Sequence, residues 1–357
     1  MKEVDYIVVG LGIAGFAICE RFEQAGKSFV VIDTPKTNSS IVAGGIMNPV
    51  VLKRFTQAWR SPEFRDEAIA MYASASEKLE GSFLAETGIQ RIFNNAQEQN
   101  DWMVASETAK LSPFLNGTLS DRPHREPLEE TTARVVHTPF GLGDVKGGYR
   151  VATVELLSAY RSYLNQTDRL IANPFHYDDL ELNTGSVHYK NWKARRILFA
   201  EGAIARNNPY FMVECLIPKK GEYIIVKAPE LRLKSILKGS CFVISLGNDL
   251  YKVGATFDHH SLSYETTPEG KEQLVATLRK LISCPFEVVD QIAGMRPTVK
   301  DRRPLLGMLE HENVIFFNGL GARGIMMAPL LSKWLFDFLE NDIPLPEAVN
   351  IKRFWKS

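Results

Sequence analysis

The sequence carries the pattern Gly-x-Gly-x-x-Gly twice, once near each end of the chain. Each copy follows a run of apolar residues and opens a segment of helical character. In such strand-to-helix turns, backbone N–H groups and the positive end of a helix receive negative charge. Two turns of this kind predict one ligand that is held at both ends. The glycines are Gly10, Gly12 and Gly15 in the first copy and Gly319, Gly321 and Gly324 in the second.

The first copy is the more specific of the two. It follows the apolar run 6–9, and a second run at 30–32 ends in Asp33. This is the spacing expected for an acidic residue that binds a ribose in a βαβ unit. A glycine-rich turn could occur in any α/β protein, but such a turn would not explain the acid at the second strand end. The first copy therefore predicts a dinucleotide site.

The second copy differs in the residues after its glycines. The segment 325–339 is apolar on several faces and leads into a polar, proline-containing stretch, with no further strand to carry a ribose-binding acid. We therefore expect this helix N-terminus to face an anionic or electron-rich part of the ligand that the first turn binds. A purely structural turn explains the local sequence equally well.

Composition limits the class of protein. With 357 residues, of which 45% are hydrophobic, the chain is long enough for two domains. Lys plus Arg and Asp plus Glu both number 42, so the chain has no net field that would attract nucleic acid or an anionic membrane. The first apolar run is broken by glycines, which fits neither a signal peptide nor a membrane span.

The cysteines indicate a reducing compartment. Four are present and none has the spacing of a metal site or a redox pair. We therefore expect a cytoplasmic protein with no bound metal. The four are Cys19, Cys215, Cys241 and Cys284.

Periodicity suggests that the chain visits two domains alternately. Helical patterns cover about 61–88 and 153–164, and a buried strand covers 196–200. From 221 to 253, short strands alternate with turns in the manner of an antiparallel sheet. We expect an α/β nucleotide-binding domain made of 1–80, 145–215 and 290–357, and a substrate domain made of 81–144 and 216–289.

The order of several motifs resembles the D-amino acid oxidase-like family of flavoproteins over essentially the whole chain. No single motif is decisive, but their order is. The motifs are Val8–Gly15 with Asp33, Ala43–Pro49, Ala200–Gly202, Lys220–Glu222 with Val253–Thr256, Gly294–Thr298 with Pro304–Gly307, and the second glycine turn.

This resemblance implies a Rossmann-like FAD-binding domain of the glutathione reductase type, joined to a mostly antiparallel β-sheet substrate domain. FAD would be non-covalent, because Met295 stands in the neighbourhood where some relatives carry a flavin-linked cysteine. The resemblance assigns the pyrophosphate to Gly10, Gly12 and Gly15, the adenosine ribose to Asp33, and the flavin to Ala43, Gly44, Gly45, Ile46 and Met47. The second turn would meet the pyrimidine edge of the flavin through Gly319, Gly321, Ala322, Arg323, Gly324 and Ile325, and further cofactor contacts are assigned to Ile13, Ala14, Glu201 and Gly202.

The resemblance also implies the chemistry, which is hydride transfer from a carbon bonded to nitrogen to flavin N5, followed by hydrolysis of the imine. Arg296 would bind the carboxylate of a small amine or amino acid. Arg323 would meet substrate or flavin, and Phe257 would line the pocket or belong to the core. No side-chain base is implied. His259 and His260 are adjacent, so at most one of them could face a pocket, and a solvated loop is the favoured interpretation.

Several functions stay open at this point. The electron acceptor could be O2 or another oxidant. The same fold could act on a 2-hydroxy acid or a polyol phosphate, or serve as a flavin-binding module without catalysis. A tRNA-modifying function is less expected, because the net charge is zero.

Overall fold

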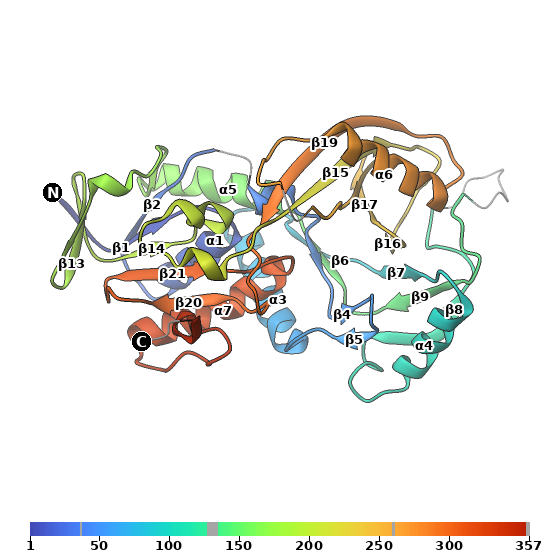
Figure 1. The fold of residues 1–357 in the computed structure, drawn as a ribbon, viewed down its shortest axis with the longest axis horizontal. Helices are drawn as coiled ribbons and strands as arrows, with labels where there is room; N and C mark the ends of the chain where they lie inside the picture. Colours follow the sequence, from blue (N-terminus) through green and yellow to red (C-terminus); the bar gives the residue numbers. More distant parts are fainter. Residues whose placement is uncertain (36–37, 127–134, 259–260, 355–357) are drawn as a thin grey trace.

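A computed structural model describes residues 1–35, 38–126, 135–258 and 261–354. It contains two large β-sheets that lie side by side, and the chain passes between them several times (Figure 1). Both described termini lie with the first sheet. No helix within these ranges is long and apolar enough to cross a membrane.

The first sheet is built on the apolar runs that the sequence singles out. Its centre is parallel: β1 (Lys2–Val9) pairs with β2 (Phe29–Ile32) and with β14 (Trp192–Phe199), and β14 pairs with β21 (Val314–Asn318). Strands buried on both faces have near-continuous apolar sequences, as here. The remaining strands are β11 (Leu170–Ile171), β12 (Leu180–Asn183), β13 (Ser186–Tyr189) and β20 (Leu305–Met308).

Three helices, α1 (Ile13–Gln24), α5 (Thr153–Gln166) and α7 (Gly324–Glu340), pack against this sheet, a fourth, α3 (Ser61–Lys78), packs on α7, and all four share a single apolar core with the sheet. The apolar character of α7 on several faces follows from its burial in this core. A Cβ on Gly324 would lie 3.5 Å from Ile13 Cγ2, so the N-termini of α7 and α1 lie close together.

The second sheet is mostly antiparallel, as the sequence predicts. Its strand order is β19-β15-β18-β17-β16-β7-β9-β8 among the described residues. The strands are β7 (Ile89–Ile92), β8 (Leu115–Ser120), β9 (Leu142–Val145), β15 (Lys219–Lys227), β16 (Ile236–Lys238), β17 (Phe242–Gly247), β18 (Leu250–Gly254) and β19 (Glu287–Arg296).

The two faces of this sheet have different neighbours. Helix α6 (Pro268–Leu281) packs on the face that carries Ile224 and Val253. Because successive side chains of a strand alternate, Tyr223 and Gly254 belong to the other face. That face turns toward the first sheet and forms one wall of a cavity between the two sheets.

Short elements connect the two sheets. Three strands form one small sheet and two form another. The three-stranded sheet consists of β3 (Ile46–Met47), β10 (Tyr149–Val151) and β6 (Leu84–Glu86), and the short helix α2 (Ser39–Val42) precedes β3. The two-stranded sheet consists of β4 (Val50–Val51) and β5 (Thr56–Gln57). Short 3₁₀ helices elsewhere in the chain are Tyr177–Asp179, Gly202–Asn207, Val213–Cys215 and Ile351–Phe354.

Two features differ from the sequence-based expectation. The helix expected to reach residue 88 ends at Lys78, because the chain turns at Glu80 and Gly81 and then forms β6 against β10. Helices α4 (Ala96–Ser106) and α6 were not predicted. Helix α4 buries few of its side chains, so it lacks a strong apolar period.

Candidate functional site

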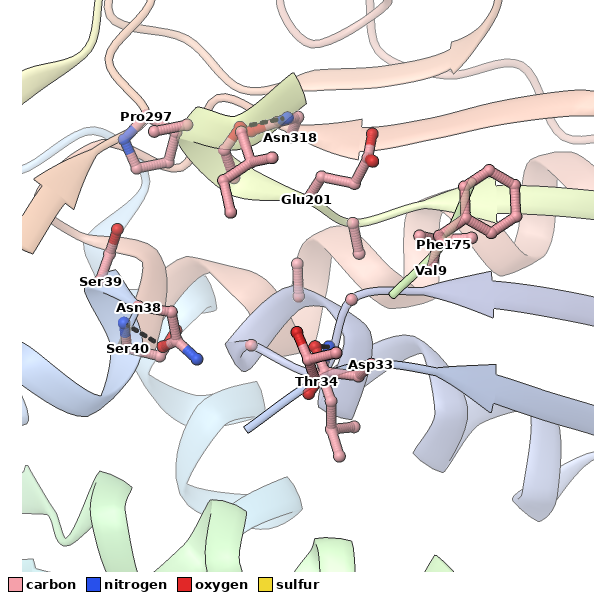
Figure 2. A pocket seen from close by; sticks show the side chains of 18 of the residues that line it. Val9, Asp33, Thr34, Asn38, Ser39, Ser40, Phe175, Glu201, Pro297 and Asn318 are labelled. Carbon is pink, nitrogen blue, oxygen red and sulfur yellow. Dashed lines mark hydrogen bonds between the residues drawn. The ribbon is translucent and has the colours of Figure 1, made fainter. Parts of the chain in front are cut away.

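Two adjoining cavities lie where the two sheets meet. Their volumes are about 360 and 440 Å³, and both are lined by Ser39, Ser40, Pro297 and Leu320. The first cavity lies at the carboxyl ends of β1, β2 and β14, which is where ligands bind in open α/β sheets. Figure 2 shows this cavity, with Asp33 and Thr34 facing Glu201 and Asn318.

The first glycine turn forms the floor of the first cavity. Gly10 has φ of +99°, and a Cβ on Gly15 would lie 2.0 Å from the Gly10 carbonyl oxygen. The close contact brings the N-terminus of α1 to the cavity, which Gly12, Ile13 and Ala14 line. Gly15 itself lies beneath the surface and acts through packing. One helix N–H is already engaged, because Ile13 N donates to Ser40 Oγ at 3.0 Å.

Asp33 lies at the end of β2 and lines the same cavity, as its spacing predicts. Its Oδ1 accepts a hydrogen bond from Leu11 N at 2.9 Å, and its Oδ2 is ion-paired with Arg161 of α5. The carboxylate therefore has a defined position at the cavity edge. The sequence gives no indication of the Arg161 contact, because 128 positions separate the two residues.

The opposite wall is held by hydrogen bonds around Glu201. Tyr177 Oη donates to Glu201 Oε1 at 2.5 Å, and Asn208 Nδ2 donates to Oε2 at 2.8 Å. Burial raises the pKa of the Glu201 carboxyl above its usual range. Asn318 Nδ2 donates to the carbonyl of Gly202 at 2.9 Å. Glu201 and Gly202 both line the cavity, and these bonds fix the loop that follows β14.

The loop before β3 forms one side of the second cavity. Ala43, Gly44, Gly45 and Ile46 line it, whereas Met47 is fully buried beside it. A Cβ on Gly45 would lie 2.1 Å from the Val151 carbonyl oxygen, so this loop lies directly against β10.

Lys252 holds the same loop from the sheet side. Its Nζ donates to the carbonyls of Val42 at 3.3 Å and Ala43 at 3.1 Å. Burial, with the nearby charge of Arg150, lowers the pKa of Lys252 to about 8.

This pKa predicts a pH effect on stability. In the unfolded chain the lysine has its ordinary pKa of about 10.4, so between about pH 8 and 10.4 the unfolded state binds more protons and the free energy of unfolding rises with pH. The two pKa values correspond to about 3 kcal/mol at most. Lys252→Met is expected to reduce this rise. It should not abolish the rise, because the pKa of Lys238 is also lowered to about 8.

Chemical denaturation of the wild type and Lys252→Met at pH 7.5 and 10 measures this difference. The variant of an exposed lysine, Lys234→Met, should keep the wild-type profile. Equal pH profiles for Lys252→Met and the wild type would contradict the prediction.

The second glycine turn opens on the second cavity. Gly321, Ala322, Gly324 and Ile325 line it, and so does Arg323, the N-cap residue of α7. Gly319 packs against Val299 instead of lining the cavity. The positive end of α7 therefore faces this space. In the described residues after α7 no strand follows, as the sequence predicts.

Arg296 and Phe257 line the same cavity. Arg296 ends β19, and its Nη1 donates to the Lys220 carbonyl at 3.3 Å. Its Cζ lies 5.1 Å from the centre of the Phe257 ring. Phe257 is 57% exposed, so it is not a core residue. His259 and His260 lie outside the described residues.

The guanidinium of Arg296 occupies a space that exists because residue 221 has no side chain. A Cβ on Gly221 would lie 2.3 Å from Arg296 Nη2 and 2.5 Å from Cζ. The arginine therefore lies directly over the backbone of β15, beside Tyr223.

Gly221→Ala is expected to leave the fold intact, because the group that must move is the end of a flexible side chain. The displaced guanidinium should raise the KM for a carboxylate substrate roughly tenfold, the size of one charge-assisted hydrogen bond. Steady-state kinetics and flavin content measure the two effects. An unchanged KM would show that Arg296 does not need this position.

Several site residues were not predicted from the sequence: Ser39, Ser40, Arg161, Tyr177, Tyr223 and Lys238. Glycines inside strands offered one usable signal, because they often mark a close approach of a ligand or another chain segment. Gly221 and Gly254 are of this kind. Among the described residues, no cluster of three or more His, Cys, Asp and Glu side chains could hold a metal ion.

The site has the form of a dinucleotide-binding oxidoreductase. The first glycine turn, with an acidic residue at the end of the next strand, lines one cavity, and the N-terminus of a second helix faces the adjoining cavity. Because the two cavities share lining residues, they form one elongated space that fits FAD. The chain belongs to the DAO family of FAD-dependent oxidoreductases, whose family model matches residues 5–338.

Several individual relatives are distant in sequence but match nearly the whole chain. The bifunctional protein ThiO/ThiG of Trichormus variabilis is 23% identical, over 99% of this chain and 55% of the relative. Glycine oxidase of Bacillus licheniformis is 21% identical, over 95% of this chain and 93% of the relative. The crystal structure of glycine oxidase from Geobacillus kaustophilus superposes with a TM-score of 0.80 at 19% identity, covering 98% of both chains.

The chain spans about half the length of the first curated relatives that it matches. The expected α/β architecture with an FAD-binding fold is confirmed by the structural similarity, and FAD as the cofactor is confirmed by the family.

Proposed function

We propose that this chain removes hydride from a C–N bond of a small amine or amino acid that bears a carboxylate. One observation carries the proposal: the guanidinium of Arg296 lies in the cavity that the second glycine turn also lines, with no carboxylate among the described residues in an ion pair with it. A cation placed so is suited to hold a substrate carboxylate by paired hydrogen bonds.

The protein's part in this reaction is to bind, orient and exclude water. Arg296 fixes the carboxylate, and Tyr223 and Phe257 form apolar walls. The positive end of α7 would stabilise negative charge at the far end of the cofactor. FAD, when bound, accepts the hydride at its N5. Loss of the hydride, which is two electrons and one proton, leaves the substrate as an iminium ion, and water hydrolyses this ion to a protonated amine and a carbonyl compound.

The names of the relatives favour the same substrate class. Three of them are called glycine oxidase. We propose O2 or another oxidant as the acceptor of the electrons.

We further propose that residues 10–15 bind the pyrophosphate, Asp33 binds the ribose, and the residues of the second cavity, 43–46 and 321–325, surround the flavin. All of these segments line the two cavities or pack directly beneath them.

The domain division and location are also proposals. The strands of the first sheet fall within 1–80, 145–215 and 290–357, which supports these segments as the FAD-binding domain, although β19 crosses the boundary at 290. All four cysteines are buried free thiols, which favours the reducing cytoplasm.

The visible spectrum of the purified protein tests the cofactor and the substrate class together. We expect a flavin spectrum that is bleached by anaerobic addition of N-substituted glycines. Bleaching by 2-hydroxy acids or polyol phosphates instead would assign the alternative substrate class. A flavin that no substrate reduces would favour the non-catalytic module, and a colourless protein that binds no FAD would contradict the proposal as a whole.

A further inference from the structure

The second cavity is lined by cations and by no acidic side chain among its described residues. The cations are Lys53, Lys238, Arg296 and Arg323. The proposed function gives a role to Arg296, which binds the substrate carboxylate, and to Arg323, which lies at the flavin end of the cofactor. It gives no role to Lys53 or Lys238. We propose that the substrate carries a second anionic group, remote from the carboxylate that Arg296 binds, and that Lys238 binds this second group. This inference rests on the proposed function and names its substrate class more closely.

The register of the second sheet places Lys238 at the far end of one row of residues. Tyr223 is paired with Gly254, Gly254 with Phe242, and Phe242 with Lys238. Residues in one row of a sheet point to the same face, and all four line the cavity. Three strand spacings separate Tyr223 from Lys238, which is roughly 14 Å.

Arg296 lies at the other end of this row. Its guanidinium occupies the gap over Gly221, two residues from Tyr223 on the same face of β15. The wall between the two cations is the Tyr223 ring, which lies over the backbone of Gly254, and the Phe242 ring. It therefore presents a cation at each end of a largely apolar strip.

The contacts that hold Lys238 in place are made by uncharged groups. Its Nζ donates to the carbonyl oxygens of Gly239 at 2.9 Å and Ser240 at 3.4 Å, and lies 4.8 Å from the centre of the Phe242 ring. No ion pair joins it to any carboxylate in the described part of the chain, and the neighbouring Arg91 is paired with Glu98. An ammonium group has three N–H donors, so one is available to a ligand.

The separation of the two cations selects a class of ligand. The two carboxylates of a single acidic amino acid lie too close together to reach both ends of the strip. A longer molecule fits: a carboxymethyl amine at Arg296, an apolar middle part along the Tyr223 and Phe242 rings, and a terminal carboxylate or phosphate-like group at Lys238. Lys53, exposed in the turn between β4 and β5, adds positive charge on the same cavity.

Matched synthetic probes test this inference. N-carboxymethyl-6-aminohexanoate and N-hexylglycine have similar length and differ in a terminal carboxylate, and N-(6-phosphonohexyl)glycine supplies a phosphonate. We expect the wild type to have a KM at least tenfold lower for the two dianions than for N-hexylglycine, the size of one charge-assisted hydrogen bond. The probe with the lower KM identifies the preferred anion as carboxylate or phosphonate.

Lys238→Met keeps the length of the side chain and removes the charge. It should bring the KM ratio between N-hexylglycine and the dianions close to one, whereas Lys234→Met, an exposed lysine beside β16, should keep the wild-type ratio. The ratio is unaffected by differences in folding or flavin content. Equal KM values for all probes in the wild type, or an unchanged ratio in Lys238→Met, would overturn the inference and leave the proposed function standing. Failure of all probes to reduce a bound flavin would overturn both.

Discussion

Arg296→Leu is expected to lower the turnover of a carboxylate-bearing amine on the order of 10²-fold while the protein keeps its FAD. The guanidinium lies in the gap over Gly221 and donates a hydrogen bond to the Lys220 carbonyl. Leucine fills a similar space without donors. The carboxylate would then lose its paired hydrogen bonds, and the reacting carbon would lose its position.

Steady-state kinetics with the best substrate from the spectral panel, together with flavin absorbance per chain, measure this effect. Arg296→Lys keeps the charge but not the paired geometry, so it should have an intermediate activity. Arg279→Leu removes an exposed arginine of α6 and should behave as the wild type. Unchanged turnover in Arg296→Leu would remove this residue from the site, and loss of flavin would show that it supports the fold instead.

Gly15→Ala is expected to abolish stable FAD binding. The added methyl would lie 2.0 Å from the Gly10 carbonyl oxygen and 3.1 Å from its carbon, and backbone atoms cannot move aside as a side chain can. Helix α1 would have to move away from the end of β1. Its N-terminal N–H groups would then no longer reach the pyrophosphate.

The flavin-to-protein ratio after gel filtration measures the loss, and far-ultraviolet circular dichroism shows whether the apoprotein is folded. Gly88→Ala is the matched control, because a Cβ there meets nothing closer than Ser235 Cβ at 3.6 Å. Retention of a full complement of FAD by Gly15→Ala would show that the turn does not bind the pyrophosphate.

Much of the first sheet could be predicted because its strands are apolar along their whole length. The runs 6–9, 30–32 and 314–317 all form buried parallel strands, and each glycine turn opens the helix expected after it. A strand that is buried on both faces can be predicted from its own continuous apolar sequence, without knowledge of any other part of the chain.

The contacts that complete the site depend on distant pairing, which local patterns do not encode. Asp33 lies at the position expected from its spacing. Its ion-pair partner Arg161 lies on α5, and the apolar pattern of α5 predicts the helix but not this ion pair. Lys238 ends a three-residue strand, and only the register across four strands brings it onto the wall shared with Tyr223. Such residues become visible once the sheet order is known.

The close approach of Gly324 to Ile13 fixes the distance between the N-termini of α1 and α7. The two helices that face the two cavities start beside each other and share one core, so their spacing is set by helix packing and not by a loop. The two helix N-termini therefore hold the groups that bind the cofactor at a fixed separation. FMN, which lacks the adenylate half, would bring only one phosphate to the first turn and no ribose to Asp33, so we expect the protein to bind FAD more tightly than FMN.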